Sequence, residues 1–358
     1  MDTETYKAND KGMTHWQKYT KDERKEILQI VAGERGLLPQ VVEKDWWVVR
    51  TLKALSLTSC ADLFLFKGGT SLSKGWNLIE RFSEDLDLAI KRENEFAILI
   101  VNKSQKEKLR KRVRKYVVEV LCKEAESSLM NMGITDFQVV PVVTRNMPDG
   151  SQVAIDSDKD PTEFHVTYKS VLDGGIEYIP PRVKVEISCL SMHEPTASRE
   201  ITSYLSQTLQ GIDDGNCVTF NTVVPTRTFL EKAFLLNEEY AKEMPRTVRM
   251  SRHLYDLERL MDTEFGKEAL SDRDLYDQIV EHRRQFYNLK YFDYTLHRPE
   301  KIKIVPPAPL LNKWEVDYRE MANSFIYGSK LPFDKLIMRM EELQGRFRRL
   351  LRDKNIST

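Results

Sequence analysis

The stretch "FLFKGGTSLSKGWNLIERFSEDLDLAI", residues 64–90, decides how the chain is interpreted, because it combines two patterns that carry chemistry. An apolar strand at its start runs into Gly68 and Gly69, and a second strand at its end carries Asp85 and Asp87. Each pattern alone is common in proteins. Together they predict a site that holds a polyphosphate and two divalent metal ions, and other segments of the chain test that interpretation.

The glycine turn is expected to bind an anion. A strand that enters Gly-Gly and continues into a helix exposes unpaired backbone N–H groups at the helix N-terminus, where the helix dipole also favours negative charge. Glycine lets a phosphate approach the backbone closely, and Thr70 or Ser71 adds a hydroxyl donor or caps the helix. The spacing is not that of a P-loop. The alternative is an ordinary tight turn with a Thr or Ser N-cap.

The two aspartates are expected to bind metal. Side chains two residues apart in a strand point to the same side of the sheet, so Asp85 and Asp87 lie side by side while Leu86 and Leu88 face the core. Two like charges this close repel each other unless a cation compensates them. Carboxylates suit Mg²⁺, and two metals about 4 Å apart assist an in-line phosphoryl displacement. The alternative is a half-exposed edge strand with solvated acids.

A third carboxylate is expected in the strand "RVKVEIS", residues 182–188. Its apolar residues alternate with polar ones, so one face is apolar and the other carries Lys184 and Glu186. An acid at this position binds a metal or takes the proton of an attacking hydroxyl. The alternative is a solvated outer face on which Lys184 and Glu186 are surface charges.

The whole chain is expected to form an α/β unit over residues 1–224 and a helical domain over residues 225–358. Apolar residues recur at helical spacing in some segments and alternate in others. Between the strand candidates at 137–143 and 163–169, a turn-rich segment predicts a hairpin or loop. Helix candidates cover residues 21–57, about 70–81, about 104–130 and four segments after Pro225; strand candidates cover residues 63–66, 85–90, 137–143, 163–169 and 182–188.

Composition excludes several classes of protein. The 55 basic and 55 acidic residues cancel, so no overall positive charge indicates a nucleic-acid partner. No apolar run of about 18 residues predicts a membrane helix, and the polar N-terminus lacks the apolar segment of a signal peptide. The four cysteines form no CxxC pair, which argues against structural zinc and a disulfide framework. We therefore expect a cytoplasmic protein.

The order strand, Gly-Gly turn, helix, DxD strand and later acidic strand resembles the active-site pattern of the nucleotidyltransferase superfamily with a DNA-polymerase-β-like palm. The run "KGGTSLSKGWNLIERFSEDLDL" is similar to that of the AbiEii/AbiGii toxin family, the nucleotidyltransferase toxins of abortive-infection toxin–antitoxin systems. "VEKDWWVVRTLKAL" resembles the family's N-terminal helix, "TFLEKAFLL" its lysine motif, "SRHLYDLERL" its arginine–aspartate motif and "VDYREM" a late segment. The resemblance covers about residues 40–345.

This resemblance implies an α+β fold, in which a polymerase-β-like palm of mixed sheet and helices precedes a helical C-terminal domain. It also implies an NTP-binding set that includes the glycine turn and basic residues from several segments. The residues implied to bind the nucleotide are Gly68, Gly69, Thr70, Ser71, Lys74, Lys232 and Arg252.

Catalytic roles are implied by the resemblance for Asp85, Asp87, Lys232 and Asp256. Asp85 and Asp87 would bind Mg²⁺ or Mn²⁺. The third metal-binding carboxylate is either Glu186 or Asp256, and Arg252 would hold Asp256. Lys232 would contact the phosphates and share one cleft with Asp256 and the acid pair. Lys232 and Asp256 are expected at the surface of this cleft. Replacing either of them by alanine should therefore abolish transfer without unfolding the protein.

The expected reaction is nucleotidyl transfer, in which an acceptor hydroxyl attacks the α-phosphate of an NTP and pyrophosphate leaves. By resemblance, the protein is a bacterial toxin of a phage-defence system, with the 3′ end of tRNA as acceptor and a cognate antitoxin encoded alongside. Two alternatives are a nucleotidyltransferase that modifies a small molecule such as an aminoglycoside, and a non-catalytic module that binds nucleotide or RNA.

A basic segment at residues 103–115, "KSQKEKLRKRVRK", offers a further contact for RNA. Clustered lysines and arginines displace the counterions of a nucleic-acid backbone. The alternative is the polar face of an amphipathic helix, whose apolar stripe includes Leu109, Val113 and Val120. The C-terminal "GRFRRLLRDK" carries the same ambiguity.

Overall fold

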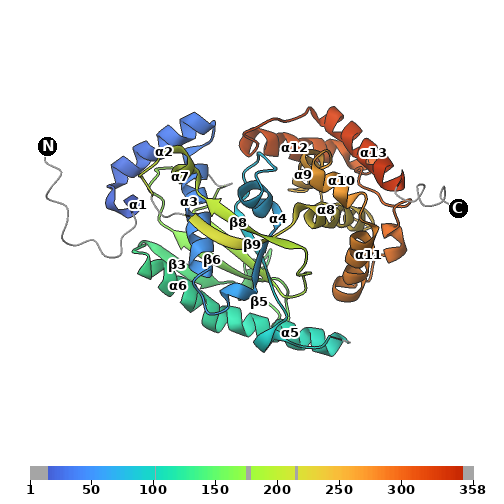
Figure 1. Ribbon diagram of the computed structural model, residues 1–358, viewed down its shortest axis with the longest axis horizontal. Coiled ribbons are helices and arrows are strands. Elements are labelled where there is room, and N and C mark those ends of the chain that lie inside the picture. Colours follow the sequence, from blue (N-terminus) through green and yellow to red (C-terminus); the bar gives the residue numbers. More distant parts are fainter. Residues whose placement is uncertain (1–14, 101, 175–178, 214–216, 350–358) are drawn as a thin grey trace. The chain divides into compact units, whose positions relative to one another are not determined.

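The computed structural model describes residues 15–100, 102–174, 179–213 and 217–349 (Figure 1). It contains a seven-stranded mixed sheet, a separate two-stranded hairpin and many helices. From Pro225 onward the described chain is helical apart from its connecting segments. This arrangement confirms the α+β fold class, a mixed sheet with helices followed by a helical C-terminal part.

The strands of the large sheet lie in the order β3-β6-β7-β2-β1-β9-β8. β2 runs parallel to β7, whereas β6 runs antiparallel to both β7 and β3. Their bounds are β1 Phe64–Lys67, β2 Asp85–Ile90, β3 Phe137–Pro141, β6 Thr162–Tyr168, β7 Arg182–Ser188, β8 Thr196–Thr202 and β9 Cys217–Val223. β2 and β7 have the predicted bounds, whereas β8 and β9 are strands that the sequence analysis did not anticipate.

Helices precede, interrupt and follow these strands. They are α1 His15–Lys18, α2 Lys21–Arg35, α3 Pro39–Leu55, α4 Gly68–Thr70, α5 Lys103–Tyr116, α6 Cys122–Asn131, α7 Tyr204–Thr208, α8 Pro225–Tyr240, α9 Ser251–Leu260, α10 Glu264–Ala269, α11 Arg273–His282, α12 Leu311–Ser324 and α13 Phe333–Arg349. The four predicted C-terminal segments correspond to α8, α9, α11 and α13, while α10 and α12 are additional elements.

The chain forms two compact units, which are described separately. The first contains the described residues up to Phe66, then Glu84–Ser191 and Ser198–Asn221. The second contains Lys67–Ser83, Met192–Ala197 and the described residues from Thr222 onward. The chain therefore passes from the first unit to the second at the glycine turn, and returns to the first unit immediately before β2.

Helix α3 forms the centre of the first unit. All its residues from Val41 to Leu52 are buried, so the helix is enclosed on every side and not only along the predicted apolar stripe. Its polar residues reach this interior because they have partners. Trp46 donates to Asp213 at 2.9 Å, and Arg50 forms an ion pair with the same carboxylate. Buried polar groups need such partners, since an unpaired one destabilises the fold.

The predicted helix at 104–130 is confirmed as one continuous helical run. It consists of α5, the π-helical segment Val117–Leu121 and α6. Leu109 and Val113 are buried as expected, but Val120 is 40% exposed. The π-helical segment accommodates an extra residue per turn, and this shifts the apolar stripe out of phase with an ideal α-helix.

The predicted helix at 70–81 is wrong in its length. The helical segment begins at Gly68 as α4, continues as the π-helical segment Ser71–Gly75 and ends there. Asn77 has a positive φ of 53°, a left-handed conformation that terminates helices. The following residues pair within the second unit instead, where the Phe82 N–H donates to the Phe325 carbonyl at 2.8 Å.

Aromatic rings build the core of the second unit. Phe229 of α8 stacks against Phe347 of α13, with ring centroids 6.1 Å apart. Phe234 of α8 meets Tyr276 of α11 edge to face at 4.9 Å. Such pairs stabilise beyond the burial of their area by about 0.5–1.5 kcal/mol. Leu254 on α9 is fully buried and contributes to the same unit's core.

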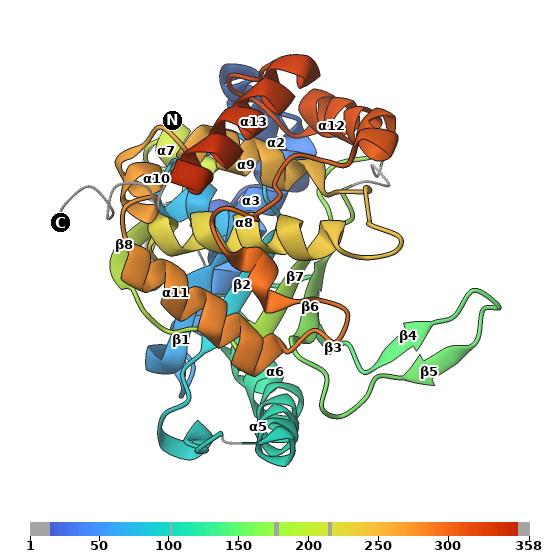
Figure 2. The ribbon, with the colours of Figure 1, turned by 90° about the vertical axis from the view of Figure 1, so that its right-hand side faces the viewer.

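The predicted hairpin between β3 and β6 is present. It consists of β4 Thr144–Asn146 and β5 Gln152–Ala154, whose residues are all exposed, and it extends away from the rest of the first unit (Figure 2). In the part of the chain that the structure describes, no helix combines the length and apolar character needed to cross a membrane.

Candidate functional site

Adjacent strands β2 and β7 bring three predicted carboxylates onto one face of the sheet in the first unit. Their parallel register places Asp87 opposite Glu186 and Asp85 opposite Lys184. Leu86, between the two aspartates, is fully buried, so the acids lie on the opposite, partly exposed face. The two strands, predicted separately, are thus neighbours, and Glu186 lies next to the acid pair.

Lys184 lies between two of these carboxylates. Its Nζ atom is 3.2 Å from Asp85 Oδ2 and also 3.2 Å from Glu186 Oε1. The three side chains are only 28%, 20% and 26% exposed respectively. In this structure Lys184 is therefore the internal cation of the acidic face, not a solvated surface charge.

The acidic face keeps a surplus of negative charge despite Lys184. Burial raises the pKa of Asp85, and repulsion from Asp87 raises it further, while Lys184 opposes the shift. Burial, followed by repulsion from Asp87, raises the pKa of Glu186 to about 7. When all three carboxylates are ionised, they and the ammonium sum to −2. A divalent cation would neutralise this charge, and hard oxygen donors are the ligands that Mg²⁺ prefers.

Asp85, Asp87 and Glu186 have the chemistry of metal ligands, although their side chains do not converge on a single point. Within the described parts of the chain, no three His, Cys, Asp or Glu side chains converge as a ready-made metal site. The ammonium of Lys184 stands in for a cation between Asp85 and Glu186. Oxygen donors on one face, their mutual repulsion and this stand-in cation together indicate that Asp85, Asp87 and Glu186 suit a divalent metal.

The polar face continues onto β6, which the sequence analysis did not connect with the site. Antiparallel pairing places Glu163 opposite Glu186 and His165 opposite Lys184. His165 Nε2 lies 2.6 Å from Glu163 Oε1, and this hydrogen bond lowers the pKa of Glu163. The alternation of polar and apolar residues in "TEFHVTY" is visible in the sequence. Only the register with β7 shows that its polar residues lie opposite Glu186 and Lys184.

The glycine turn belongs to the second unit. Gly68 has a φ of +78°, which favours glycine, whereas Gly69 does not have a positive φ. Thr70 and Ser71 are fully buried. The Thr70 hydroxyl donates to Ser83 Oγ at 2.9 Å, and the Ser71 hydroxyl donates to the Gly68 carbonyl at 2.9 Å. Both hydroxyls therefore stabilise the turn itself, and Lys74 in the following segment is also buried.

Asp256 is the centre of a buried charge cluster in the second unit. Arg81 donates to its two carboxylate oxygens at 2.6 and 2.7 Å, and Lys232 Nζ lies 2.8 Å from Oδ2. Asp256 is fully buried and Lys232 is nearly so, which excludes the alternative that they are solvated surface residues. Burial opposes ionisation, but Arg81 and Lys232 together lower the pKa of Asp256. The cluster has a net charge of +1.

Arg81 is a residue that the sequence analysis missed, and it also closes over the glycine turn. A Cβ atom on Gly69 would lie 2.7 Å from Arg81 Nη2 and 2.9 Å from Ser83 Oγ. The turn, Arg81 and the lysine motif thus form one connected arrangement. No local pattern identifies Arg81, because its partner lies 175 residues further along the chain.

Of the two candidates for the third carboxylate, Glu186 lies on the same sheet face as Asp85 and Asp87. Glu186 lies directly opposite Asp87 on the neighbouring strand. Asp256 instead uses both oxygens for Arg81 and Lys232 inside the second unit. Arg252, the expected partner of Asp256, lies one turn before it in α9, but the ion pairs found for the Asp256 carboxylate are with Arg81 and Lys232.

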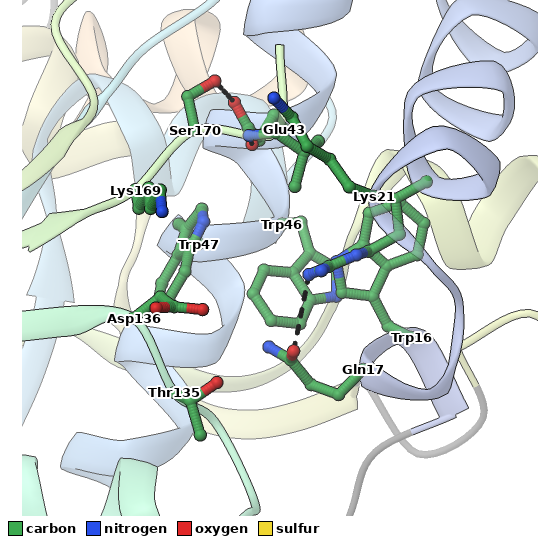
Figure 3. Close-up of a pocket in the computed structure, with 12 residues that line it drawn as sticks. Trp16, Gln17, Lys21, Glu43, Trp46, Trp47, Thr135, Asp136, Lys169 and Ser170 are labelled. Carbon is green, nitrogen blue, oxygen red and sulfur yellow. Dashed lines mark hydrogen bonds between the residues drawn. The ribbon is translucent and has the colours of Figure 1, made fainter.

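A pocket of ≈ 190 Å³ in the first unit contains none of the candidate residues (Figure 3). Trp16, Trp46 and Trp47 line it, and all three rings are buried. On its wall, Glu43 accepts a hydrogen bond from Ser170 Oγ at 2.6 Å. Because the rings also pack on one another, the pocket is a gap beside the core of this unit.

A family model described as nucleotidyl transferase AbiEii toxin of type IV toxin–antitoxin systems matches residues 50–339. The chain belongs to this family. The match confirms the resemblance seen in the glycine turn, the DxD strand and the lysine motif. A comparison with curated proteins finds no match. The AbiEii family indicates a nucleotidyltransferase toxin and implies an antitoxin partner.

Replacing Gly69 by alanine should disturb the second unit through Arg81. The added methyl group would displace the guanidinium that holds Asp256, so we expect a lower melting temperature and weaker NTP binding in equilibrium dialysis. Gly33→Ala in α2 is the control, because its added Cβ meets no atom within 4 Å and alanine stabilises a helix by roughly 0.5–1 kcal/mol. A Gly69→Ala variant that matches the wild type in both measurements would contradict the arrangement.

Replacing Asp256 by asparagine should destabilise the protein, which corrects the expectation that this residue can be changed without effect on folding. The substitution leaves two buried cations without a carboxylate, a loss of about 3–5 kcal/mol in the free energy of unfolding. Lys232→Met should cost less, because it leaves Arg81 and Asp256 as a neutral pair. Urea denaturation measures both, and equal losses would show that the cluster does not depend on Asp256.

Proposed function

We propose that this chain transfers a nucleotidyl group from an NTP to an RNA hydroxyl in a metal-dependent reaction, with the 3′ end of tRNA as the acceptor. Family membership supports the reaction type. The observation that carries the metal dependence is the register of β2 and β7, which aligns Asp85, Asp87 and Glu186 on one polar face.

In this proposal Asp85, Asp87 and Glu186 hold Mg²⁺ or Mn²⁺. When bound, such a metal neutralises phosphate charge and lowers the pKa of a coordinated hydroxyl. The carboxylates themselves keep the cation on the sheet face and orient what it binds. Burial, which raises the pKa values of Asp85 and Glu186, disfavours their ionised forms without a cation, and a bound metal would stabilise those forms.

The second unit supplies positive charge for the triphosphate. Arg81, Lys232 and Asp256 together carry +1, and Arg81 lies against Gly69 of the turn. Asp256 prevents the two buried cations from repelling each other and holds Lys232 in position. We propose that this surplus charge attracts the phosphates of the NTP, as the family's lysine motif implies.

An RNA acceptor is favoured over a small molecule by helix α5. Several of its basic residues are exposed, among them Lys108, Lys111 and Lys115, while Leu109 and Val113 anchor the opposite side in the core. The helix is therefore amphipathic, as the alternative predicted, and it still presents a basic surface. Such a surface binds a phosphate backbone without base specificity.

Asp85→Asn and Asp87→Asn should each lower transfer by orders of magnitude, because asparagine removes a metal-binding charge with little change in volume. The assay incubates the purified protein with each α-³²P-labelled NTP, Mg²⁺ and total RNA, and measures label in RNA. Asp156→Asn, an exposed residue outside the sheet, is the control. Near-native labelling by Asp87→Asn would place the metal elsewhere, and labelling of an added aminoglycoside instead of RNA would favour the small-molecule alternative.

A further inference from the structure

We propose that Lys184 is a built-in counter-ion of the acidic face, and that metal binding by Asp85 and Glu186 requires the displacement of its ammonium group. This inference rests on the proposed function, since it concerns the same carboxylates. It adds a residue that competes with the metal, which neither the family nor the motifs identify.

Geometry makes the two cations mutually exclusive. The Lys184 Nζ atom lies 3.2 Å from both Asp85 Oδ2 and Glu186 Oε1. Mg²⁺ binds oxygen at about 2.0–2.1 Å. A metal held by these carboxylate oxygens would have to approach them more closely than the ammonium does, and the ammonium already contacts both. The ammonium must therefore move before both oxygens can hold a metal.

Placement in the sheet explains why Lys184 stays between the acids when no metal is bound. A solvated lysine gains little from an exposed ion pair, because water screens the charge and the flexible side chain loses entropy. Lys184 is instead only 28% exposed and contacts two carboxylates at once. These two contacts offset the loss of hydration of the ammonium and hold it between the acids.

A destination for the displaced ammonium lies on the neighbouring strand. His165 on β6 is the register partner of Lys184, and Glu163 lies diagonally across from it beside Glu186. Glu163 already accepts a hydrogen bond from His165, and Lys184 contributes to its lowered pKa. We expect the ammonium to swing toward Glu163, which keeps it on the polar face.

The consequence is an acidic face whose charge is partly compensated without metal, and whose affinity for a free metal ion is lowered by Lys184. Removing Lys184 should have opposite effects in the two conditions. Without metal, the repulsion among Asp85, Asp87 and Glu186 loses its counter-ion and the fold is destabilised. With metal, the competitor is absent and affinity rises. A residue with a purely structural role would lower stability in both conditions and leave metal affinity unchanged or weaker.

The test compares Mn²⁺ binding by the wild type, Lys184→Met, Lys184→Arg and Arg182→Met, with free Mn²⁺ followed by electron paramagnetic resonance. Lys184→Met should bind at least about tenfold more tightly, because a unit charge next to the ligands is gone. Lys184→Arg should stay close to the wild type. Arg182→Met removes an exposed charge from the same face of β7 and should change affinity less than about threefold, since solvent screens it.

Thermal melting of the same variants supplies the second measurement. Lys184→Met should melt below the wild type in EDTA, and saturating Mn²⁺ should raise its melting temperature more than that of the wild type. Unchanged or weaker Mn²⁺ binding by Lys184→Met would overturn the inference, as would an equal gain in Arg182→Met.

The Asp87→Asn variant distinguishes a failure of the inference about Lys184 from a failure of the proposed function. If Asp87→Asn loses Mn²⁺ binding while Lys184→Met behaves like the wild type, the metal site stands and the role of Lys184 falls. If no variant, including the wild type, binds Mn²⁺ with or without a non-hydrolysable NTP analogue, both proposals fail.

Discussion

The parallel pairing of β2 with β7 is the constraint on which the acidic face depends. Side chains alternate along a strand, so a slip of one residue would turn Glu186 into the core and bring a valine or isoleucine beside Asp87. The buried residues on the other face, such as Leu86 and Val185, prevent that slip because they must stay in the core. The hydrophobic core thus sets the geometry of the polar residues that carry the chemistry.

Local periodicity was sufficient to predict the strands β2 and β7, but not the contacts that their polar side chains make with one another. Alternation identified β2 and β7 with their bounds and selected Asp85, Asp87 and Glu186. It could not identify Lys184 as their counter-ion, because a lysine on a polar face has the same pattern whether it points into water or toward two acids. β8 and β9 alternate as well, yet their short apolar sets did not separate them from loops.

Long-range pairing also explains what was missed in the second unit. Asp256 was selected by its motif, but its burial follows from Arg81 and Lys232, which lie in distant segments. A position at the surface of a cleft was expected, because a carboxylate is rarely buried unless it is paired. The helix after the turn is shorter than predicted for a related reason. Asn77 adopts a left-handed conformation, and the next residues pair with the segment around Phe325 instead of continuing the helix.

The two units differ in the charge of their candidate residues. The acidic face of the first unit gathers carboxylates around the ammonium of Lys184, so it favours cations. The second unit buries one carboxylate between two cations and keeps a surplus of positive charge, so it favours phosphates. In both, one residue of opposite sign holds like charges together: Lys184 among the acids, and Asp256 between Arg81 and Lys232. That compensation lets the chain fold without ligand, because uncompensated clusters of this density would repel. If the proposed ligands bind here, each must compete with an internal partner, a metal ion with Lys184 and a phosphate group with Asp256.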